Sequence, residues 1–363
     1  MNLKRRQKQL QSSLSSGGLD ALLVTHLPNI RYLCGFTGSA GALLVTERQC
    51  VFFTDGRYTA QARAEVSGAR IVIGKKAPMA SLAEWLQSQK AVARSLKRMG
   101  FEGDYVSFTG YKSLAKAMPS GIKLSSASSI VERIRIIKDS DELALMRSAA
   151  VMGASLFDRA LEVIRPGIKE IEVAAEMQDM ASKAGAEGMS FSTIIAAGER
   201  SALPHGRASG APIPPDGFVV CDFGVILAGY CSDRTRTVYV GRPSEEARSA
   251  YEAVREAQQA ALDAVRPGQK LGEVDGAARK TLQKHKLAKY FTHSTGHGVG
   301  LEIHEAPRVA AGQEDLLKPG MVITIEPGVY LPGKFGIRIE DMAVVTETGC
   351  EVLAPSSKEL IVC

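Results

Sequence analysis

Two pairs of acidic residues are the positions in this 363-residue chain with the clearest capacity for chemistry. Asp222 and Glu326 each end an apolar run that predicts a buried strand, and a second acid follows each of them, Asp233 and Glu340. A buried carboxylate is costly unless a partner or a metal ion compensates it. A structural salt bridge explains one such acid. Four converging carboxylates repel one another unless cations hold them, which favours two divalent ions.

Histidines supply the other candidate groups. Three of the six, His293, His297 and His304, fall within twelve residues of a glycine-rich, strand-like segment. Its glycines allow the backbone to approach another group closely. His205 lies in a loop upstream of the first acid pair. The remaining two histidines have no such neighbours, and we interpret them as surface or core residues.

Four carboxylates and one imidazole form a set of hard oxygen ligands with one borderline nitrogen. Such a set suits Mn²⁺, Co²⁺, Fe²⁺ or Zn²⁺ in a paired site. Two such ions activate water and polarise a carbonyl group, which is hydrolytic chemistry. The other histidines could then stabilise developing charge or move a proton.

An internal repeat explains how the two acid pairs can meet. Arg165-Pro-Gly167 recurs 101 residues later as Arg266-Pro-Gly268, and each copy follows an alanine-rich helical pattern. Each copy then leads through a second helix, predicted over Ile171–Ala184 in the first half, to a strand that ends at Asp222 or Glu326. Because duplicated halves usually pack about a pseudo-two-fold axis, we expect both acid pairs at the centre.

The first third of the chain predicts a separate small α/β unit. The apolar run Val51–Thr54 predicts a strand, and Ser81–Arg94 predicts a helix. Gly121–Ile130 is polar, and we interpret it as the approach to a domain boundary near residue 132. Asp139-Ser-Asp-Glu142 is typical of a capping box that begins a helix of the second unit.

Composition excludes several other classes of protein. The net charge of +6 and the pI of about 8.9 are mild for this length, so we expect no nucleic-acid partner. The six scattered cysteines include no Cys-X-X-Cys pair, which indicates a reducing compartment rather than a disulfide framework. No signal peptide and no apolar run long enough to span a membrane is evident. We therefore expect a cytoplasmic protein without a membrane partner.

Five candidate ligands follow one another along the C-terminal part of the chain. Asp233 comes eleven residues after Asp222, and the other three lie in the motifs Thr295-Gly-His297-Gly-Val-Gly, Ile325-Glu326-Pro-Gly and Arg338-Ile-Glu340-Asp. The pattern resembles the pita-bread metallopeptidases (family M24), which include methionine aminopeptidase, Xaa-Pro aminopeptidase (aminopeptidase P) and Xaa-Pro dipeptidase (prolidase). The resemblance covers about residues 140–355. It implies an α/β chain with a creatinase-like α/β domain at residues 1–132. A pita-bread catalytic domain, a duplicated α+β fold with pseudo-two-fold symmetry, is implied at residues 133–363.

The resemblance also implies roles for individual residues. Glu326 is the implied general base and proton shuttle, and His304 stabilises the oxyanion. Two divalent ions, Mn²⁺ first and Co²⁺, Zn²⁺ or Fe²⁺ as possible substitutes, are implied at a site made of Asp222, Asp233, His297, Glu326 and Glu340. The implied catalytic residues are His205, His293, His304, Glu326 and Arg338.

Motifs in the first third distinguish members of the family. Asn29–Gly41 and Phe53–Tyr58 resemble the creatinase-type N-terminal domain of Xaa-Pro peptidases, and they favour an Xaa-Pro aminopeptidase over a prolidase that acts on dipeptides only. The expected substrates are peptides with proline at the second position, and the family implies a homo-oligomer, a dimer. A non-catalytic pita-bread binding protein and a metal-free creatinase-like hydrolase would share the fold, but the intact ligand set disfavours both.

Overall fold

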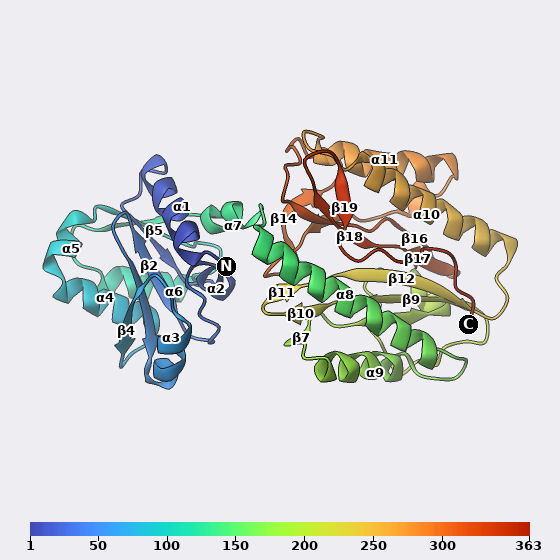
Figure 1. The fold of residues 1–363 in the computed structure, drawn as a ribbon, viewed down its shortest axis with the longest axis horizontal. Helices are drawn as coiled ribbons and strands as arrows, with labels where there is room; N and C mark the ends of the chain where they lie inside the picture. Colours follow the sequence, from blue (N-terminus) through green and yellow to red (C-terminus); the bar gives the residue numbers. More distant parts are fainter. The chain divides into compact units, whose positions relative to one another are not determined.

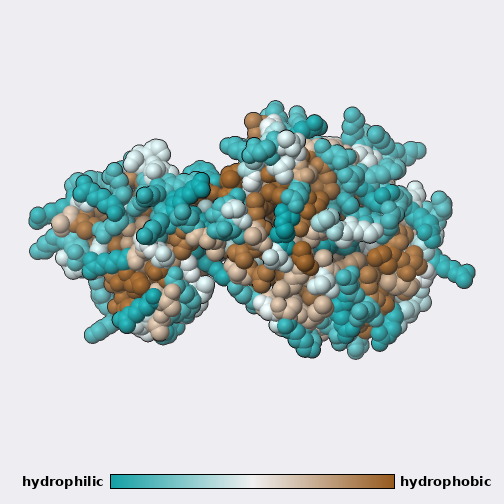
Figure 2. All heavy atoms as spheres, viewed as in Figure 1, coloured by the Kyte–Doolittle hydropathy of each residue, from teal (hydrophilic) through white to brown (hydrophobic).

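The computed structural model describes all residues, 1–363, and the chain divides into two compact units, Met1–Arg135 and Ile136–Cys363. No helix is both long and apolar enough to cross a membrane. In the face drawn in Figure 2, hydrophilic side chains cover much of each unit, with apolar patches among them. Each unit has its own hydrophobic core.

The N-terminal unit is a six-stranded mixed sheet with helices packed on it (Figure 1). The strand order is β4-β3-β2-β1-β5-β6, and the central strands are buried throughout. The strands are β1 (Ala21–Val24), β2 (Ala42–Thr46), β3 (Cys50–Asp55), β4 (Arg70–Gly74), β5 (Arg98–Phe101) and β6 (Lys123–Ser126). The helices are α1 (Leu3–Ser16), α2 (Leu27–Cys34), η1 (Gly56–Tyr58), α3 (Thr59–Glu65), α4 (Pro78–Ser88), α5 (Lys90–Ser95), α6 (Phe108–Ala117) and α7 (Ile130–Arg135).

One expectation for this unit is wrong in detail, and one segment holds a strand that the sequence did not predict. The helix predicted over Ser81–Arg94 is two helices, because Gln89 between α4 and α5 has a non-helical backbone with φ −96° and ψ 64°. The polar segment Gly121–Ile130 contains strand β6, which pairs in parallel with β5. This strand lies at the edge of the sheet with Lys123 and Ser126 exposed, so polar side chains are tolerated there. The strand predicted at Val51–Thr54 is confirmed as part of β3.

The C-terminal unit is built from two halves, each with a pair of helices followed by strands (Figure 1). The first half contains α8 (Ser140–Val163), α9 (Glu170–Lys183), β7 (Gly188–Met189), β8 (Ile194–Ala197), η2 (Gly198–Ala202), β9 (Gly217–Phe223), β10 (Val225–Leu227), β11 (Tyr230–Cys231) and β12 (Arg234–Val240). The second contains α10 (Glu245–Ala264), α11 (Leu271–Lys284), η3 (Ala288–Tyr290), β13 (Gly296–Gly298), β14 (Glu305–Val309), β15 (Val322–Ile325), β16 (Gly328–Leu331), β17 (Phe335–Arg338), β18 (Asp341–Val345) and β19 (Cys350–Val352).

The predicted repeat has a matched backbone in both halves. Gly167 and Gly268 follow the helices α8 and α10 with positive φ of 86° and 82°, a conformation that glycine adopts without strain. The Gly167 amide donates to the carbonyl oxygen of Ile213, in the segment before β9, and the Gly268 amide donates to that of Leu317, in the segment before β15. The predicted capping box is confirmed, since Glu142 N donates to Asp139 at 2.9 Å and the Glu142 carboxylate accepts from Asp139 N at 2.9 Å.

Strand pairing in each half brings the acid-bearing segments together. In the sheet β12-β9-β8, Asp222 lies opposite Thr235, two residues beyond Asp233. In the sheet β14-β13-β15-β18-β19, Ile325 lies opposite Asp341, so Glu326 and Glu340 flank a paired position. Apolar residues of α8 and α9 pack on the first sheet, and those of α10 and α11 pack on the second. The acid pairs therefore lie at equivalent places in the two halves.

Candidate metal centre and catalytic cavity

All nine site residues predicted from the sequence line one cavity of about 600 Å³ in the C-terminal unit. Asp222 lies on β9, and Asp233 lies between β11 and β12. His297 is in β13, Glu326 follows β15, and Glu340 lies between β17 and β18. The fold thus brings together the five candidate ligands Asp222, Asp233, His297, Glu326 and Glu340 with the further candidates His205, His293, His304 and Arg338.

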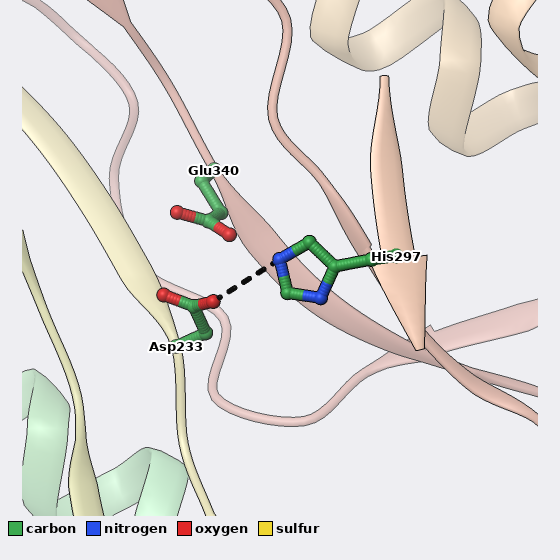
Figure 3. A group of neighbouring side chains, drawn as sticks. All are labelled: Asp233, His297 and Glu340. Carbon is green, nitrogen blue, oxygen red and sulfur yellow. Dashed lines mark ion pairs between the residues drawn. The ribbon is translucent and has the colours of Figure 1, made fainter. Parts of the chain in front are cut away.

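Three of the candidate ligands form a group compact enough to hold a metal ion (Figure 3). Ligand atoms of Asp233, His297 and Glu340 lie within 4.8 Å of one another. The Nε2 atom of His297 is 3.5 Å from Asp233 Oδ2 and 3.5 Å from Glu326 Oε1. Its Nδ1 lies 3.0 Å from the carbonyl oxygen of Gly298, and donation to that oxygen leaves the Nε2 lone pair directed at the carboxylates.

The carboxylates are in an environment that disfavours their charge in the absence of cations. Burial, with repulsion from neighbouring carboxylates, raises the pKa of Asp233 and of Glu340 well above their ordinary values. Burial also raises the pKa of Glu326, to about 8. Buried oxygens Oδ1 of Asp222 and Oε1 of Glu340 have no hydrogen-bond partner. Buried polar atoms are almost always satisfied, so these orphaned acceptors fit bound divalent cations.

A buried arginine supports the candidate ligands. The guanidinium of Arg338 forms an ion pair with Asp222 Oδ2, and its Nε donates to Thr235 Oγ1 at 3.1 Å. The hydroxyl of Thr235 in turn donates to Glu340 Oε2 at 2.7 Å. On the other side, Arg338 Nη1 donates to the Tyr330 hydroxyl at 2.6 Å. Arg338 therefore connects Asp222 of the first half to Glu340 of the second half, directly in one case and through Thr235 in the other.

The candidate histidines line the same cavity but differ in their surroundings. His293 Nε2 lies 2.9 Å from the Tyr330 hydroxyl, and its Nδ1 lies 2.8 Å from the carbonyl oxygen of Ser294. Burial, with the nearby Arg338 charge, lowers the pKa of His293 to about 4, so the ring is neutral near pH 7. The ring of His304 is 4.4 Å from that of His297, and burial lowers its pKa as well. His205 is exposed in the cavity wall.

Sequence reasoning missed four polar residues of this site. Thr235 and Tyr330 connect Arg338 to Glu340 and to His293, and Arg207 and Arg308 line the cavity. Arg308 lies directly opposite His297 in the pairing of β13 with β14. Only strand register reveals that relation, because the two residues lie on strands joined by an irregular connection. Neither Arg207 nor Arg308 has an acidic partner in the chain.

Comparison with known proteins agrees with this geometry. Residues 144–347 match the metallopeptidase family M24, and residues 6–137 match the creatinase/prolidase N-terminal domain. The chain belongs to metallopeptidase family M24. It is therefore a hydrolase of the Xaa-Pro peptidase type, and its fold is a creatinase-type N-terminal domain followed by a pita-bread catalytic domain. The fold class predicted from the sequence is confirmed.

Several full-length relatives of this M24 member are dipeptidases. It is 34% identical over 360 residues to the Xaa-Pro dipeptidase of Pyrococcus horikoshii, covering 99% of both chains. The structure of an Xaa-Pro dipeptidase from Bacillus anthracis superposes with a TM-score of 0.95 at 38% identity, covering 100% of both chains. An X-Pro aminopeptidase from Thermotoga maritima gives a TM-score of 0.88 at 34% identity, covering 95% of this chain and 98% of the other.

These relatives change the balance between the two candidate activities. The N-terminal motifs favoured an Xaa-Pro aminopeptidase, but the comparisons do not support that activity over the dipeptidase activity, which they favour. The motif Asp55-Gly-Arg-Tyr58 joins the end of β3 to the short helix η1, and the Asp55 side chain caps that helix by accepting a hydrogen bond from the Arg57 amide. This capping role is structural and fits either activity. Family membership also implies divalent metal ions and Xaa-Pro substrates.

Proposed function

We propose that this M24 metallopeptidase is an Xaa-Pro dipeptidase that uses two divalent ions, with Mn²⁺ as the ion. The observation that carries the proposal is the position of Arg308, an unpaired cation opposite His297 in the cavity of the candidate ligands. A dipeptide has a free carboxylate one residue beyond its scissile bond, and an arginine fork recognises a carboxylate well. The dipeptidases among the full-length relatives support the same assignment.

The candidate ligand set supports two ions rather than one. Four carboxylates and one imidazole offer more oxygen donors than a single site needs, and two carboxylate oxygens lack any partner. We assign Asp222, Asp233, His297, Glu326 and Glu340 as the ligands. Oxygen-rich ligation favours Mn²⁺ among the candidate ions. When bound, the ions would polarise the scissile carbonyl and acidify the attacking water.

The protein groups then handle the protons and the developing charge. Glu326 lines the cavity, and its carboxylate can take a proton from the attacking water as the general base. The water oxygen bonds to the carbonyl carbon, and the C–N bond breaks as Glu326 passes the proton to the proline nitrogen. His304 and His205 face the same cavity and can donate hydrogen bonds to the carbonyl oxygen as it gains charge.

Proline bonds need such a site because the amide before proline is tertiary and the ring fixes φ. The leaving nitrogen carries no hydrogen, so a protein group must protonate it as the bond breaks. The neutral ring of His293, held by the hydroxyl of Tyr330, lies in the cavity wall beside Arg338. We propose that His293 contributes to the proline pocket.

An Xaa-Pro aminopeptidase is the second candidate, and one observation favours it. A second cavity of about 600 Å³ shares Phe191, Ser192 and Arg207 with the first. This open space could take the residues that follow proline in a longer peptide. The Thermotoga maritima aminopeptidase also resembles the chain over nearly its full length.

Product analysis separates the two candidates. The Mn²⁺-loaded protein is incubated separately with Ala-Pro and with Ala-Pro-Ala, and kcat/KM is measured for each by chromatography of the products. A dipeptidase cleaves Ala-Pro with a kcat/KM about tenfold or more above that for the tripeptide, because only Ala-Pro places a carboxylate at Arg308. Release of alanine from the tripeptide at equal or higher efficiency supports the aminopeptidase. Cleavage of neither peptide overturns both.

A further inference from the structure

A buried carboxylate on the second helix of each half anchors a loop that carries cavity histidines. Glu170 begins α9 and Asp275 lies in α11, and both residues are 0% exposed. Neither lines the catalytic cavity. The repeat in the sequence does not align them, because Glu170 corresponds to Leu271 and Asp275 to Ala174. Each half thus meets the same structural need with a carboxylate at a different helix position.

The first anchor holds the segment that carries His205. The Glu170 carboxylate accepts hydrogen bonds from Ala197 N at 2.9 Å and from Ser209 Oγ at 2.6 Å. These two partners flank the loop, twelve residues apart. Arg200 completes the anchor, because its Nε donates to the Glu170 carboxylate at 3.0 Å and its Nη2 donates to the Arg207 carbonyl oxygen at 2.9 Å.

The second anchor holds the segment that carries His293 and His297. The Asp275 carboxylate accepts from the Thr295 hydroxyl at 2.8 Å and from Arg279 Nε at 2.7 Å. Arg279 Nη2 donates to the His293 carbonyl oxygen at 2.6 Å, and its Nη1 donates to that of Phe291 at 3.1 Å. As in the first half, an arginine joins the buried acid to carbonyl oxygens of a histidine loop.

The second anchor also reaches the proposed general base. The Thr295 carbonyl oxygen accepts from the Glu326 amide at 2.8 Å. Asp275 therefore fixes Thr295, and Thr295 fixes the backbone that carries the Glu326 carboxylate. A displacement of about 1 Å in a catalytic group costs about a hundredfold in rate, so such anchoring matters even though neither acid contacts the substrate.

We propose that Glu170 and Asp275 are positioning residues that hold the histidine loops, residues 197–209 and 291–297, in their catalytic geometry. The inference rests on the proposed peptidase function. Each acid serves the loop of its own half, so loss of one carboxylate loosens one loop and leaves the other unchanged. Neither acid contacts the substrate, and both variants are assayed with the metal site fully loaded, so we expect kcat to change much more than KM.

The test uses full-length, Mn²⁺-loaded Glu170→Gln and Asp275→Asn variants. Exposed acids on the same two helices provide the matched controls Asp179→Asn and Glu273→Gln. Ala-Pro hydrolysis gives kcat and KM, and hydrogen exchange followed by mass spectrometry gives the protection of each loop. We expect kcat to fall about tenfold to a hundredfold with KM within about twofold, and faster exchange confined to the loop of the altered half. The controls behave like the unmodified protein.

Two results would overturn the proposal: unchanged kcat in both variants, or faster exchange of a loop with kcat retained. If Asp275→Asn does not fold, Arg279→Lys tests the second anchor instead. Lysine keeps the positive charge beside Asp275 but cannot reach the carbonyl oxygens of both Phe291 and His293. We expect Arg279→Lys to lower kcat with KM retained, and unchanged kcat refutes the second anchor. If the unmodified protein cleaves no Xaa-Pro peptide, the proposed function fails, whereas the exchange pattern still reports whether the acids hold the loops.

Discussion

Replacing Thr235 by valine tests the proposed metal site without touching a ligand. Thr235 is fully buried, and its hydroxyl donates to Glu340 Oε2 at 2.7 Å while it accepts from Arg338 Nε at 3.1 Å. Valine keeps the shape of the side chain and removes both hydrogen bonds. The Glu340 carboxylate, whose Oε1 already lacks a partner, then has no side-chain donor to orient it.

The expected magnitude follows from the charge of the acceptor. A hydrogen bond to a charged group contributes about 1.5–3 kcal/mol, which corresponds to roughly a tenfold to hundredfold change in an equilibrium constant. Partners of metal ligands typically contribute a similar factor to metal affinity or activity. We therefore expect Thr235→Val to weaken Mn²⁺ binding by about tenfold to a hundredfold and to lower Ala-Pro hydrolysis at limiting metal.

Metal affinity is measured by competition with a chelator of known affinity, and circular dichroism checks the fold. Thr237→Val is the matched control, because Thr237 lies two residues further along β12, is also buried, and bonds only to the backbone of Arg338. Thr235→Ser keeps the hydroxyl and should bind metal nearly normally. If Thr235→Val binds Mn²⁺ as tightly as the control does, Glu340 is not a ligand and the proposed metal site is wrong at this position.

The cavity supports three further predictions. Burial raises the folded-state pKa of Glu326 from 4.5 to about 8, so the metal-free folded chain binds more protons than the unfolded chain between these pH values. The metal-free protein therefore loses stability as the pH rises from 5 to 8. Removing the metal with EDTA should lower Tm more at pH 8 than at pH 5, and equal decreases in Tm would contradict this prediction. Arg308→Gln should raise KM for Ala-Pro about tenfold or more and leave KM for Ala-Pro-Ala nearly unchanged, because only the dipeptide places its carboxylate at Arg308. Steady-state kinetics give KM for both peptides, and an equal increase for the two would contradict the prediction. Tyr330→Phe removes the hydroxyl between Arg338 and His293 and should lower kcat about tenfold, whereas unchanged kcat would show that this link does not position His293.

The sequence predicts the candidate metal ligands better than it predicts the residues that surround them. Asp222 and Glu326 could be found because buried strands that end in an acid are rare and because the repeat presents two of them. Their convergence in one cavity agrees with the expected pseudo-symmetry. Whether each of them binds a metal ion is still a prediction. Thr235 and Arg308 could not be found, because each depends on which strand lies beside which.

The N-terminal unit shows where local patterns fail. Ser81–Arg94 has a helical sequence, but the chain turns at Gln89, and α4 packs with Trp85 against Phe53 of the sheet, with ring centroids 5.6 Å apart. Strand β6 is too polar to predict, and only its pairing with β5 makes it a strand. In both cases tertiary contacts decide the structure over local preference. The choice between dipeptidase and aminopeptidase was equally beyond the local motifs.

The proposal that Asp222, Asp233, His297, Glu326 and Glu340 hold two ions that make the chain a peptidase is best tested with Asp233→Asn. Bound metal per chain and Ala-Pro hydrolysis are measured together on the unmodified protein and on the variant, with circular dichroism as the check of folding. We expect about two divalent ions per unmodified chain. We also expect a folded variant that has lost metal and nearly all activity. A folded Asp233→Asn protein with full metal content and unchanged hydrolysis would contradict the proposal.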